Sequence, residues 1–353
     1  MINRYSIAKL YLSRSLVLLV VTDHHHQNHQ MSTMFMYLFC FSLVLIASAR
    51  VIRYSDGNFE NDLVNDNSAD NEDLIIKRYQ LARDQKHGFI YDPEFYSNEI
   101  KQDTIYPLTD ADFEKGSILS EHDIVGNDSI LYSSEYFEGD IVEDLSERNA
   151  VLEGSNVWPK GRIPYVLSRK FSERDRAVIA RAMATYHNST CIKFEPRTND
   201  DTDYIYIYPG LGCASLVGRV GRMQPVLLGR GCVYSGIVEH ELMHATGFWH
   251  EQSRADRDSY VKINWDNIER GMEYNFAKLS LREITHLGEP YDYGSVMHYG
   301  SHAFAKGFGA TISPLKDGVT IGQRRGLSAT DITKINKLYK CNSRRFLKAH
   351  KKG

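Results

Sequence analysis

The chain has 353 residues, of which 42% are hydrophobic and 25% charged, and its formal net charge at pH 7 is −3. This length and apolar content allow one sizeable core plus additional segments. Residues 50–148 hold 24 Asp/Glu and 9 Lys/Arg, a net charge of −15, whereas residues 149–353 hold 20 and 30, a net charge of +10. We therefore expect a domain boundary between these two parts. A solvated surface explains the basic part, so we expect no nucleic-acid partner.

The N-terminal residues are typical of an export signal. Residues 34–49 (MFMYLFCFSLVLIASA) form an apolar run that is too short to span a membrane comfortably, and they end in the small-residue pattern of a signal cleavage site. We predict a signal peptide over residues 1–49 and a secreted, extracellular protein with no membrane contact after its removal. A second apolar run over residues 16–21 leaves two alternatives: translation starts at Met31 or Met34, or the region is a signal anchor.

Residues 50–148 are acidic, Asn-rich and only sparsely periodic, which predicts a loosely structured segment. Near its end, residues 137–140 (FEGD) place a flexible glycine beside a carboxylate. Taken alone, four such residues are more typical of a solvated turn. Arg148 is a basic residue at the boundary, and cleavage there by a trypsin-like protease would leave Asn149 as the new N-terminus.

The cysteine count supports export. Cys40 leaves with the predicted signal peptide, and the rest of the chain keeps an even number of cysteines, as disulfide-bonded exported proteins do. These are Cys191, Cys213, Cys232 and Cys341. The count alone leaves three pairings open. Asn127 (NDS) and Asn188 (NST) are acceptors for N-glycosylation by their triplets.

Periodicity and capping residues predict the elements of the C-terminal part. Ser172, with Asp175 three residues later, begins a helix that runs to Asn188, and Ser328 begins a final helix over residues 329–340. Alternating patterns predict strands over residues 162–167, 191–195, 203–208 and 213–218. The remaining residues, 342–353, form a basic tail.

The segment HELMHATGFWH has the spacing of a metal site. His240 and His244 are four residues apart, so on a helix both imidazoles project from one face and can bind one cation. Glu241 lies beside the first histidine, where a carboxylate can act as general base toward a metal-bound water. Gly247 ends the helix and lets His250 return as the third ligand. A bare HExxH occurs by chance in helices, but the extended pattern rarely arises without a metal.

Two stretches carry a resemblance to a known family. The metal segment continues as HEQSRADR over residues 250–257, and residues 295–299 read SVMHY, a turn that bears a methionine. Together these stretches resemble the astacin family of zinc endopeptidases, which belongs to the metzincins, and the likeness extends over roughly residues 137–341. It implies a catalytic domain with an α+β fold, whose N-terminal half contains a mixed twisted sheet and the zinc helix. The C-terminal half of that domain is expected to be irregular and to carry the methionine turn and a final helix.

The resemblance assigns roles at the site. It implies one Zn²⁺ per chain on His240, His244 and His250, above Met297 as the floor of the site. Tyr299 is expected as a further ligand, which swings away to hydrogen-bond the tetrahedral intermediate. The implied disulfides are Cys191–Cys341 and Cys213–Cys232.

The resemblance also implies a zymogen. FEGD matches the FxGD of astacin pro-segments, so Asp140 is expected to bind zinc in place of the catalytic water. Residues 50–148 would then be an inhibitory pro-segment, and residues 149–341 the catalytic domain.

A trypsin-like protease would activate such a chain. The amine of Asn149 is then expected to fold inward and pair with Glu251, directly or through water. The alternative partner for Glu251 is Arg254 or Arg257.

For substrates, residues 213–218 match the edge strand at which the family binds extended peptides through main-chain hydrogen bonds. The contacts are assigned to Cys213, Ala214, Ser215 and Leu216. Ala214 and Leu216 replace aromatic residues that are often found there. Arg324, and after it Arg325, would favour an acidic residue just after the scissile bond.

We therefore expect a secreted, monomeric zinc metalloendopeptidase that acts on proteins and peptides. The competing hypothesis is an exported zinc-binding or matrix-binding protein without turnover. The presence of both Glu241 and Tyr299 counts against it.

Overall fold

The computed structural model describes residues 106–142, 156–281 and 285–341, and all of them belong to one compact unit of the chain. The predicted signal peptide, the predicted cleavage point between Arg148 and Asn149, and the basic tail lie outside the described residues. Among the described residues, no helix is long and apolar enough to cross a membrane.

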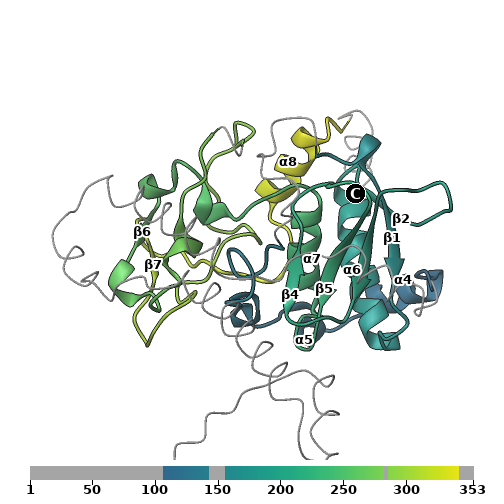
Figure 1. The fold of residues 1–353 in the computed structure, drawn as a ribbon, viewed down its shortest axis with the longest axis horizontal. Helices are drawn as coiled ribbons and strands as arrows, with labels where there is room; N and C mark the ends of the chain where they lie inside the picture. The colour runs from purple at the N-terminus through teal and green to yellow at the C-terminus, as the bar shows by residue number, and fades with distance from the viewer. Residues whose placement is uncertain (1–105, 143–155, 282–284, 342–353) are drawn as a thin grey trace, which may run out of the picture. The chain divides into compact units, whose positions relative to one another are not determined.

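Residues 162–228 form a five-stranded sheet, in the order β2-β1-β3-β5-β4 (Figure 1). The strands are β1 (Arg162–Leu167), β2 (Lys193–Pro196), β3 (Tyr204–Tyr208), β4 (Cys213–Ser215) and β5 (Met223–Leu228). All neighbours run parallel except β4, which pairs antiparallel with β5 at one edge of the sheet. The predicted strands are confirmed, although β2 begins two residues later and β4 ends three residues earlier than expected.

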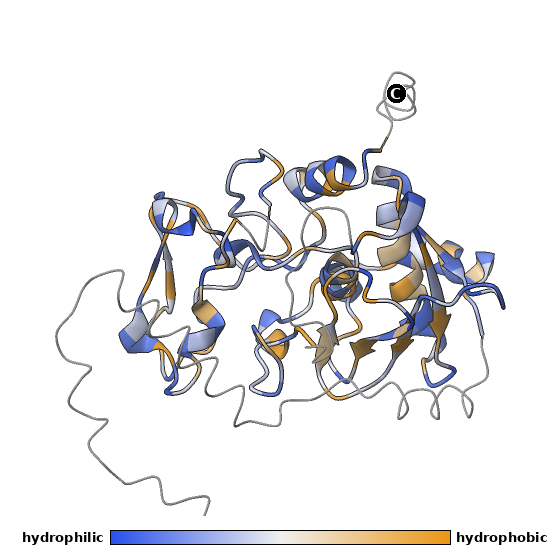
Figure 2. Ribbon diagram, turned by 45° about the horizontal axis from the view of Figure 1, so that its top comes forward, coloured by the Kyte–Doolittle hydropathy of each residue, from blue (hydrophilic) through white to orange (hydrophobic). Residues whose placement is uncertain are grey.

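Side chains alternate between the two faces of this sheet, as the pleat requires. In β3, sequence YIYIY, the isoleucines pack into the main core and the tyrosines point to the opposite face. Figure 2 shows the apolar residues concentrated on the strands and the adjoining helices. The tyrosine face also packs against Tyr136 and Val142, which belong to the predicted pro-segment.

Two helices, α6 (Glu173–Ser189) and α7 (Ser235–Ala245), lie side by side against the sheet (Figure 1). The capping box predicted for the first of them, between Ser172 and Asp175, is present. Every residue of α7 is buried. Its Gly236 packs so closely that an added Cβ would lie 1.8 Å from the carbonyl oxygen of Arg324. The helix that carries the metal motif is thus fixed on all sides.

Beyond α7 the chain is mostly irregular. Its elements are η3 (Glu251–Ser253), η4 (Arg257–Ser259), β6 (Val261–Ile263), η5 (Trp265–Asn267), η6 (Glu273–Phe276), β7 (Ile312–Pro314) and α8 (Ala329–Leu338). Strands β6 and β7 pair antiparallel, and a separate apolar cluster around Phe276 and Tyr299 packs this half. Ser328 caps α8 as predicted, and the helix ends two residues earlier than expected. The predicted α+β fold is confirmed.

Both expected disulfides are present. Cys191–Cys341 closes a separation of 150 residues, and Cys213–Cys232 closes one of 19 residues. On the chain-entropy account, such closures stabilise the fold by about 3–5 kcal/mol each. The predicted glycosylation acceptors Asn127 and Asn188 are exposed.

Residues 106–142 are more ordered than the sequence predicted. They contain α4 (Asp110–Ser117), α5 (Glu121–Ile124) and the 3-10 turn η1 (Asp128–Leu131), and a further 3-10 turn, η2 (Pro159–Gly161), precedes β1. α4 packs along α6, where Arg176 binds Asp112 at 2.7 Å and an added Cβ on Gly116 would lie 2.6 Å from the carbonyl oxygen of Ala177. The expectation of a loosely structured segment is wrong here, because the ordering contacts come from a helix far along the chain.

Candidate metal centre and active site

Three histidines meet at the end of α7. His240 and His244 lie one turn apart on this helix, and Gly247, at a φ of 110°, turns the chain so that His250 returns toward them. Their ring centroids lie 4.7 to 5.3 Å apart, and the Nε2 atoms of His240 and His250 are separated by 3.4 Å. The structure thus brings the three predicted ligands together.

A hydrogen bond at Nδ1 fixes each imidazole ring. His240 donates to the carbonyl of Val296 at 2.8 Å, and His244 donates at 2.7 Å to the carbonyl four residues further on. His250 donates to the carboxylate of Glu138 at 2.6 Å. Because each Nδ1 carries a proton, each Nε2 points to the common centre, as metal-ligating histidines do.

The fourth group at this centre comes from the predicted pro-segment. A turn with a φ of 85° at Gly139 carries Asp140 into the triad. Its Oδ2 lies 2.9 Å from Nε2 of His240, and its Oδ1 lies 3.4 Å and 3.2 Å from Nε2 of His244 and His250. The four residues form a buried group whose ligand atoms all lie within 4.8 Å of one another.

The nitrogen and oxygen atoms that face this centre lack enough protons to hydrogen-bond to one another, which indicates a bound cation. Burial lowers the pKa of His240 to about 3, so the ring is neutral and its single proton is already donated to Val296. Its Nε2 lone pair then faces an Asp140 oxygen at 2.9 Å, and two lone pairs at that distance repel unless a cation lies between them. Within the described residues, Oδ1 of Asp140 and Nε2 of His244 are also buried without a hydrogen-bond partner.

The donor set fits zinc. Three imidazole nitrogens and one carboxylate oxygen are typical zinc ligands, and tetrahedral bonds of about 2.0–2.1 Å place such ligands about 3.3 Å apart. The measured separations from Asp140 to the three rings, 2.9, 3.2 and 3.4 Å, lie around that value.

The charges of the centre keep Asp140 ionised. Burial would raise the pKa of Asp140, but the three neighbouring imidazoles, His250 most strongly, lower it well below its ordinary value. Burial would lower the pKa of His250, but Asp140 and Glu138 raise it to about 9, so a metal that binds its Nε2 displaces a proton there. The carboxylate therefore enters the triad as an anion, which is the form that binds a metal.

Glu241 lies beside the triad without a partner. It is 0% exposed, and among the described residues neither of its carboxylate oxygens has a hydrogen-bond partner. Burial and the neighbouring Asp140 raise its pKa well above the ordinary value, and Arg324 opposes this shift. A buried, unpartnered carboxyl group is costly, and such groups concentrate at sites of proton transfer.

Comparison with known families agrees with this geometry. A family model described as Astacin, a peptidase family, matches residues 150–340, which is more than half of the chain. This chain belongs to the astacin family. Zinc, the predicted cofactor, is the metal of that family, and the buried group of three histidines and one aspartate is able to hold it.

Individual relatives support the assignment. Zinc metalloproteinase nas-13 of Caenorhabditis elegans is 48% identical over 262 residues, which cover 68% of this chain and 58% of that protein. Zinc metalloproteinase nas-4 of the same species is 41% identical over 296 residues, which cover 76% of this chain and 91% of that protein. This chain covers 46% of zinc metalloproteinase nas-15, also from C. elegans, so it spans about half the length of some relatives.

A solved structure is also similar. High choriolytic enzyme 1, a hatching enzyme zinc-protease from Oryzias latipes (medaka fish), is 46% identical to this chain. The TM-score is 0.52, and the match covers 55% of this chain and 100% of that chain.

The methionine turn of this astacin contacts the triad, since the carbonyl of Val296 accepts from Nδ1 of His240. Met297 is buried, and its carbonyl accepts from the main-chain N–H of Glu251 at 3.1 Å. Tyr299 is 0% exposed and its ring centroid lies 4.8 Å from that of His250, but its hydroxyl donates to the main-chain carbonyl of Glu138 at 2.6 Å. Tyr299 therefore contacts the predicted pro-segment here, and its expected roles toward zinc and the oxyanion stay predictions.

The predicted pro-segment also occupies the predicted substrate strand of the astacin domain. The N–H of Val142 donates to the carbonyl of Ser215, and the N–H of Ser215 donates to the carbonyl of Asp140, both at 2.9 Å. The segment runs parallel to β4 at this point. The predicted substrate contacts are all buried: Cys213, Ala214, Ser215 and Leu216. The edge that an extended peptide would use is already paired.

Arg324 is buried, at 2% exposure. Its Nη1 donates to the carbonyls of His298 and Gln323 at 3.0 and 2.8 Å, while among the described residues Nε and Nη2 have no hydrogen-bond partner. Arg325 instead forms an exposed ion pair with Glu121. Of the two arginines predicted to contact substrate, Arg324 is the one that keeps spare donors near the metal centre.

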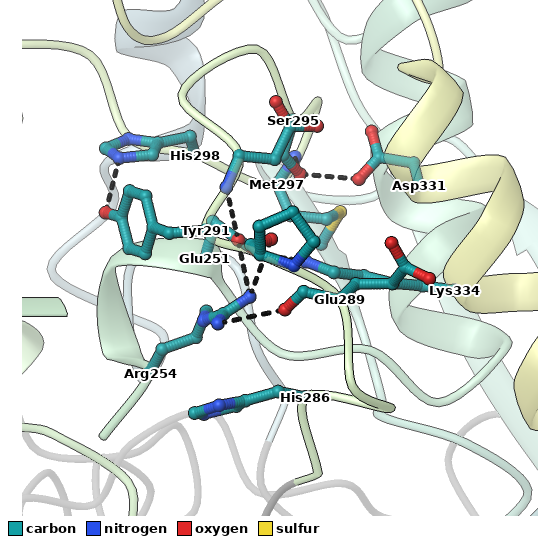
Figure 3. A network of polar contacts seen from close by, with 12 residues as sticks. Glu251, Arg254, His286, Glu289, Tyr291, Ser295, Met297, His298, Asp331 and Lys334 are labelled. Atoms are coloured by element: carbon teal, nitrogen blue, oxygen red, sulfur yellow. Dashed lines mark hydrogen bonds and ion pairs between the residues drawn. The ribbon is translucent and has the colours of Figure 1, made fainter. Parts of the chain in front are cut away.

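Glu251, directly after the third histidine, lies in a buried polar network (Figure 3). Its Oε1 accepts from Arg254 at 3.1 Å and from the N–H of Asp292 at 2.9 Å, and its Oε2 lies 2.5 Å from Nζ of Lys334. The ion pair with Arg254, one of the expected alternatives, is therefore present. Asn149, the other expected partner, lies outside the described residues.

Sequence reasoning missed two charged residues at this site. Glu138 adjoins Asp140 only through a turn, and its carboxylate accepts from His250 and from Ser253, each at 2.6 Å. Lys334 follows Asp331 by three residues on α8, and both are buried. Helical spacing places Lys334 on the same face as Asp331, but it does not indicate that Glu251 is its partner.

Proposed function

We propose that this chain is the zymogen of a secreted zinc endopeptidase that hydrolyses peptide bonds of protein substrates. One observation carries the proposal: two carboxylates share a single buried metal centre. Asp140 takes a ligand position, and Glu241 lies beside it without a hydrogen-bond partner among the described residues. The first carboxylate accounts for a silent precursor, and the second accounts for turnover after processing.

Glu241 would act as the general base. Zinc, when held by the three histidines, lowers the pKa of water to about 7 and polarises a carbonyl group. The Glu241 carboxylate accepts the proton from the attacking water and returns it to the leaving amine. The burial that raises its pKa favours the protonated form between these two transfers. Tyr299, once its hydroxyl leaves Glu138, would donate to the oxyanion.

Processing would open the site by removing one segment. Residues of the pro-segment make all three blocking contacts: Asp140 at the triad, Glu138 at Tyr299, and residues 140–142 along β4. Cleavage after Arg148 by a trypsin-like protease would release them together. The freed amine of Asn149 would then pair with Glu251, directly or through water.

Substrates would bind as extended peptides along β4, through the main-chain groups that the pro-segment now pairs. The spare donors of Arg324 would favour an acidic residue just after the scissile bond, because a guanidinium binds a carboxylate in a bidentate manner. Secretion fits the two disulfides, since such bonds persist in oxidising compartments.

The test is cleavage of casein by the processed protein, with and without a chelator, in wild type and in Glu241→Gln. We expect the chelator to abolish cleavage and added zinc to restore it. Glu241→Gln should keep one zinc and the wild-type circular dichroism, and lose nearly all hydrolysis, because an amide cannot accept the proton. Glu269→Gln changes an exposed glutamate and serves as the matched control.

Two results would contradict the proposal. Stoichiometric zinc with undiminished cleavage in Glu241→Gln would remove the general base. Stoichiometric zinc with no cleavage in processed wild type would favour the alternative, an exported zinc-binding or matrix-binding protein without turnover.

A further inference from the structure

Lys334 is a buried lysine, and in the part of the chain that the structure describes Glu251 is the one carboxylate that forms an ion pair with it. It lies on α8 at 5% exposure, and its Nζ is 2.5 Å from Oε2 of Glu251, which is itself 4% exposed. A buried ammonium group is unfavourable unless it is paired, so this contact determines where the lysine side chain lies. In Figure 3, Lys334 reaches Glu251 from α8, while Arg254 approaches from the segment after the zinc helix.

Glu251 connects two parts of the metal centre. It follows His250 directly in the chain, and its main-chain N–H donates to the carbonyl of Met297 at 3.1 Å. The main chain at Glu251 therefore joins the third ligand to the methionine turn, and its carboxylate is the side-chain contact that anchors this junction.

The same face of α8 contacts the turn from a second position. Asp331 lies one helical turn before Lys334 and accepts from the hydroxyl of Ser295 at 2.6 Å and from the N–H of Val296 at 2.9 Å. The carbonyl of Val296 in turn accepts the Nδ1 proton of His240. One helix thus reaches two of the three histidines, each through one intermediate residue.

We propose that Lys334 is a positioning residue for the zinc site: by neutralising Glu251 it holds the chain that carries His250. The expected amine of Asn149 is not needed for this, because Lys334 is in place on Oε2 while Arg254 and the N–H of Asp292 occupy Oε1. An arriving amine would share a carboxylate that is already neutralised. The inference rests on the proposed function in that it concerns the same zinc site; its first readout, zinc release, needs neither processing nor turnover.

The experiment compares Lys334→Met with Lys337→Met in the full chain and in processed protein that begins at Asn149. Lys337 lies on the same helix, but its side chain is 45% exposed and pairs with Glu289 at the surface. The first readout is the rate at which bound zinc passes to a chelator. Residues that orient metal ligands typically change metal affinity by about 10–100-fold when they are removed, so Lys334→Met should lose zinc at least about tenfold faster. Lys337→Met should match wild type.

A purely structural role would not reproduce the second readout. In processed protein, Lys334→Met should lower kcat by about tenfold with KM changed less than about twofold, because the substrate strand is untouched and only the ligand geometry is disturbed. Lys334→Arg, which keeps the charge, should recover at least half of the lost zinc retention.

A double change covers the possibility that Lys334→Met does not fold. If the damage comes from an unpaired Glu251 carboxylate, then Glu251→Gln combined with Lys334→Met should fold and retain zinc better than Lys334→Met alone. The proposal is overturned if zinc release and kcat in Lys334→Met stay within about twofold of wild type. A third form, processed protein with two or three residues added ahead of Asn149, has no amine at the native position. The proposal is also overturned if Lys334→Met loses zinc quickly only in this form, because the amine of Asn149 would then be the main partner of Glu251. Zinc release is measured without substrate, so a failure of the proposed catalysis leaves this test intact.

Discussion

Asp112→Asn should loosen the attachment of α4 to α6. Asp112 and Arg176 are 8% and 6% exposed, and the guanidinium binds both carboxylate oxygens, at 2.7 and 3.2 Å. Arg176 also donates to the carbonyls of Tyr106 and Pro107 at 3.0 and 2.7 Å, and those two bonds survive the substitution. Removing one partner of a buried pair costs about 3–5 kcal/mol, and the two remaining acceptors reduce our expectation to about 2–3 kcal/mol.

Hydrogen exchange of the amides in α4 measures this opening directly. A loss of about 2–3 kcal/mol corresponds to a fall in protection of about 30- to 150-fold in the uncleaved chain. Lys115→Gln is the control, because Lys115 pairs with Glu173 in solvent, and its protection should not change. Protection that changes less than about threefold in Asp112→Asn would show that apolar packing alone holds α4, and would refute the reasoning.

The same pair predicts a dependence on pH. Burial would raise the pKa of Asp112, but the hydrogen bonds from Arg176 and Thr109 outweigh it, so the net pKa lies below its ordinary value. A carboxylate with a lowered pKa stabilises the docked state above the pKa of the free group, and this stabilisation is lost as pH falls through the lowered value. Wild-type protection of α4 should therefore fall as the pH drops below about 4, and Asp112→Asn should show no such fall.

Two further perturbations follow from the structure. Asp140→Ala should give the uncleaved chain measurable activity against a peptide substrate, and a variant as silent as wild type would mean that the bulk of the segment alone blocks the site. High salt should weaken inhibition in wild type, because an acidic segment covers a basic domain. Gly236→Ala should lower the free energy of unfolding by at least about 1–3 kcal/mol, because its Cβ would meet the carbonyl of Arg324 at 1.8 Å. Gly307→Ala has no atom within 4 Å of the new Cβ and should unfold in urea as wild type does, and equal midpoints for the two variants would contradict the argument.

Local patterns predicted the parts of the site that depend on spacing along the chain. The four-residue interval between His240 and His244 is a property of one helix, and the turn after it needs only the glycine at position 247. The strands could be predicted for the same reason, since alternation in YIYIY reports the two faces of the sheet directly. These features can be predicted without knowing which distant segments contact them.

The parts that could not be predicted depend on contacts between distant segments. Lys334 is 83 positions from Glu251, and Arg176 is 64 positions from Asp112, so neither pair leaves a periodic trace in the sequence. From its composition alone, an acidic, weakly periodic stretch is predicted to be unstructured. α4 is ordered by its contact with Arg176, a buried arginine on α6.

The tyrosine face of the sheet suggests a second role for the predicted pro-segment, besides the proposed inhibition. Tyr136 and Val142, 4% and 2% exposed, pack against the aromatic side chains of β3 and against Leu216 beside the substrate strand. If processing removes that segment, water would reach the aromatic side chains that it now covers, and apolar dyes would gain a surface to bind. On the proposed processing, the processed form would then be less soluble than the uncleaved chain.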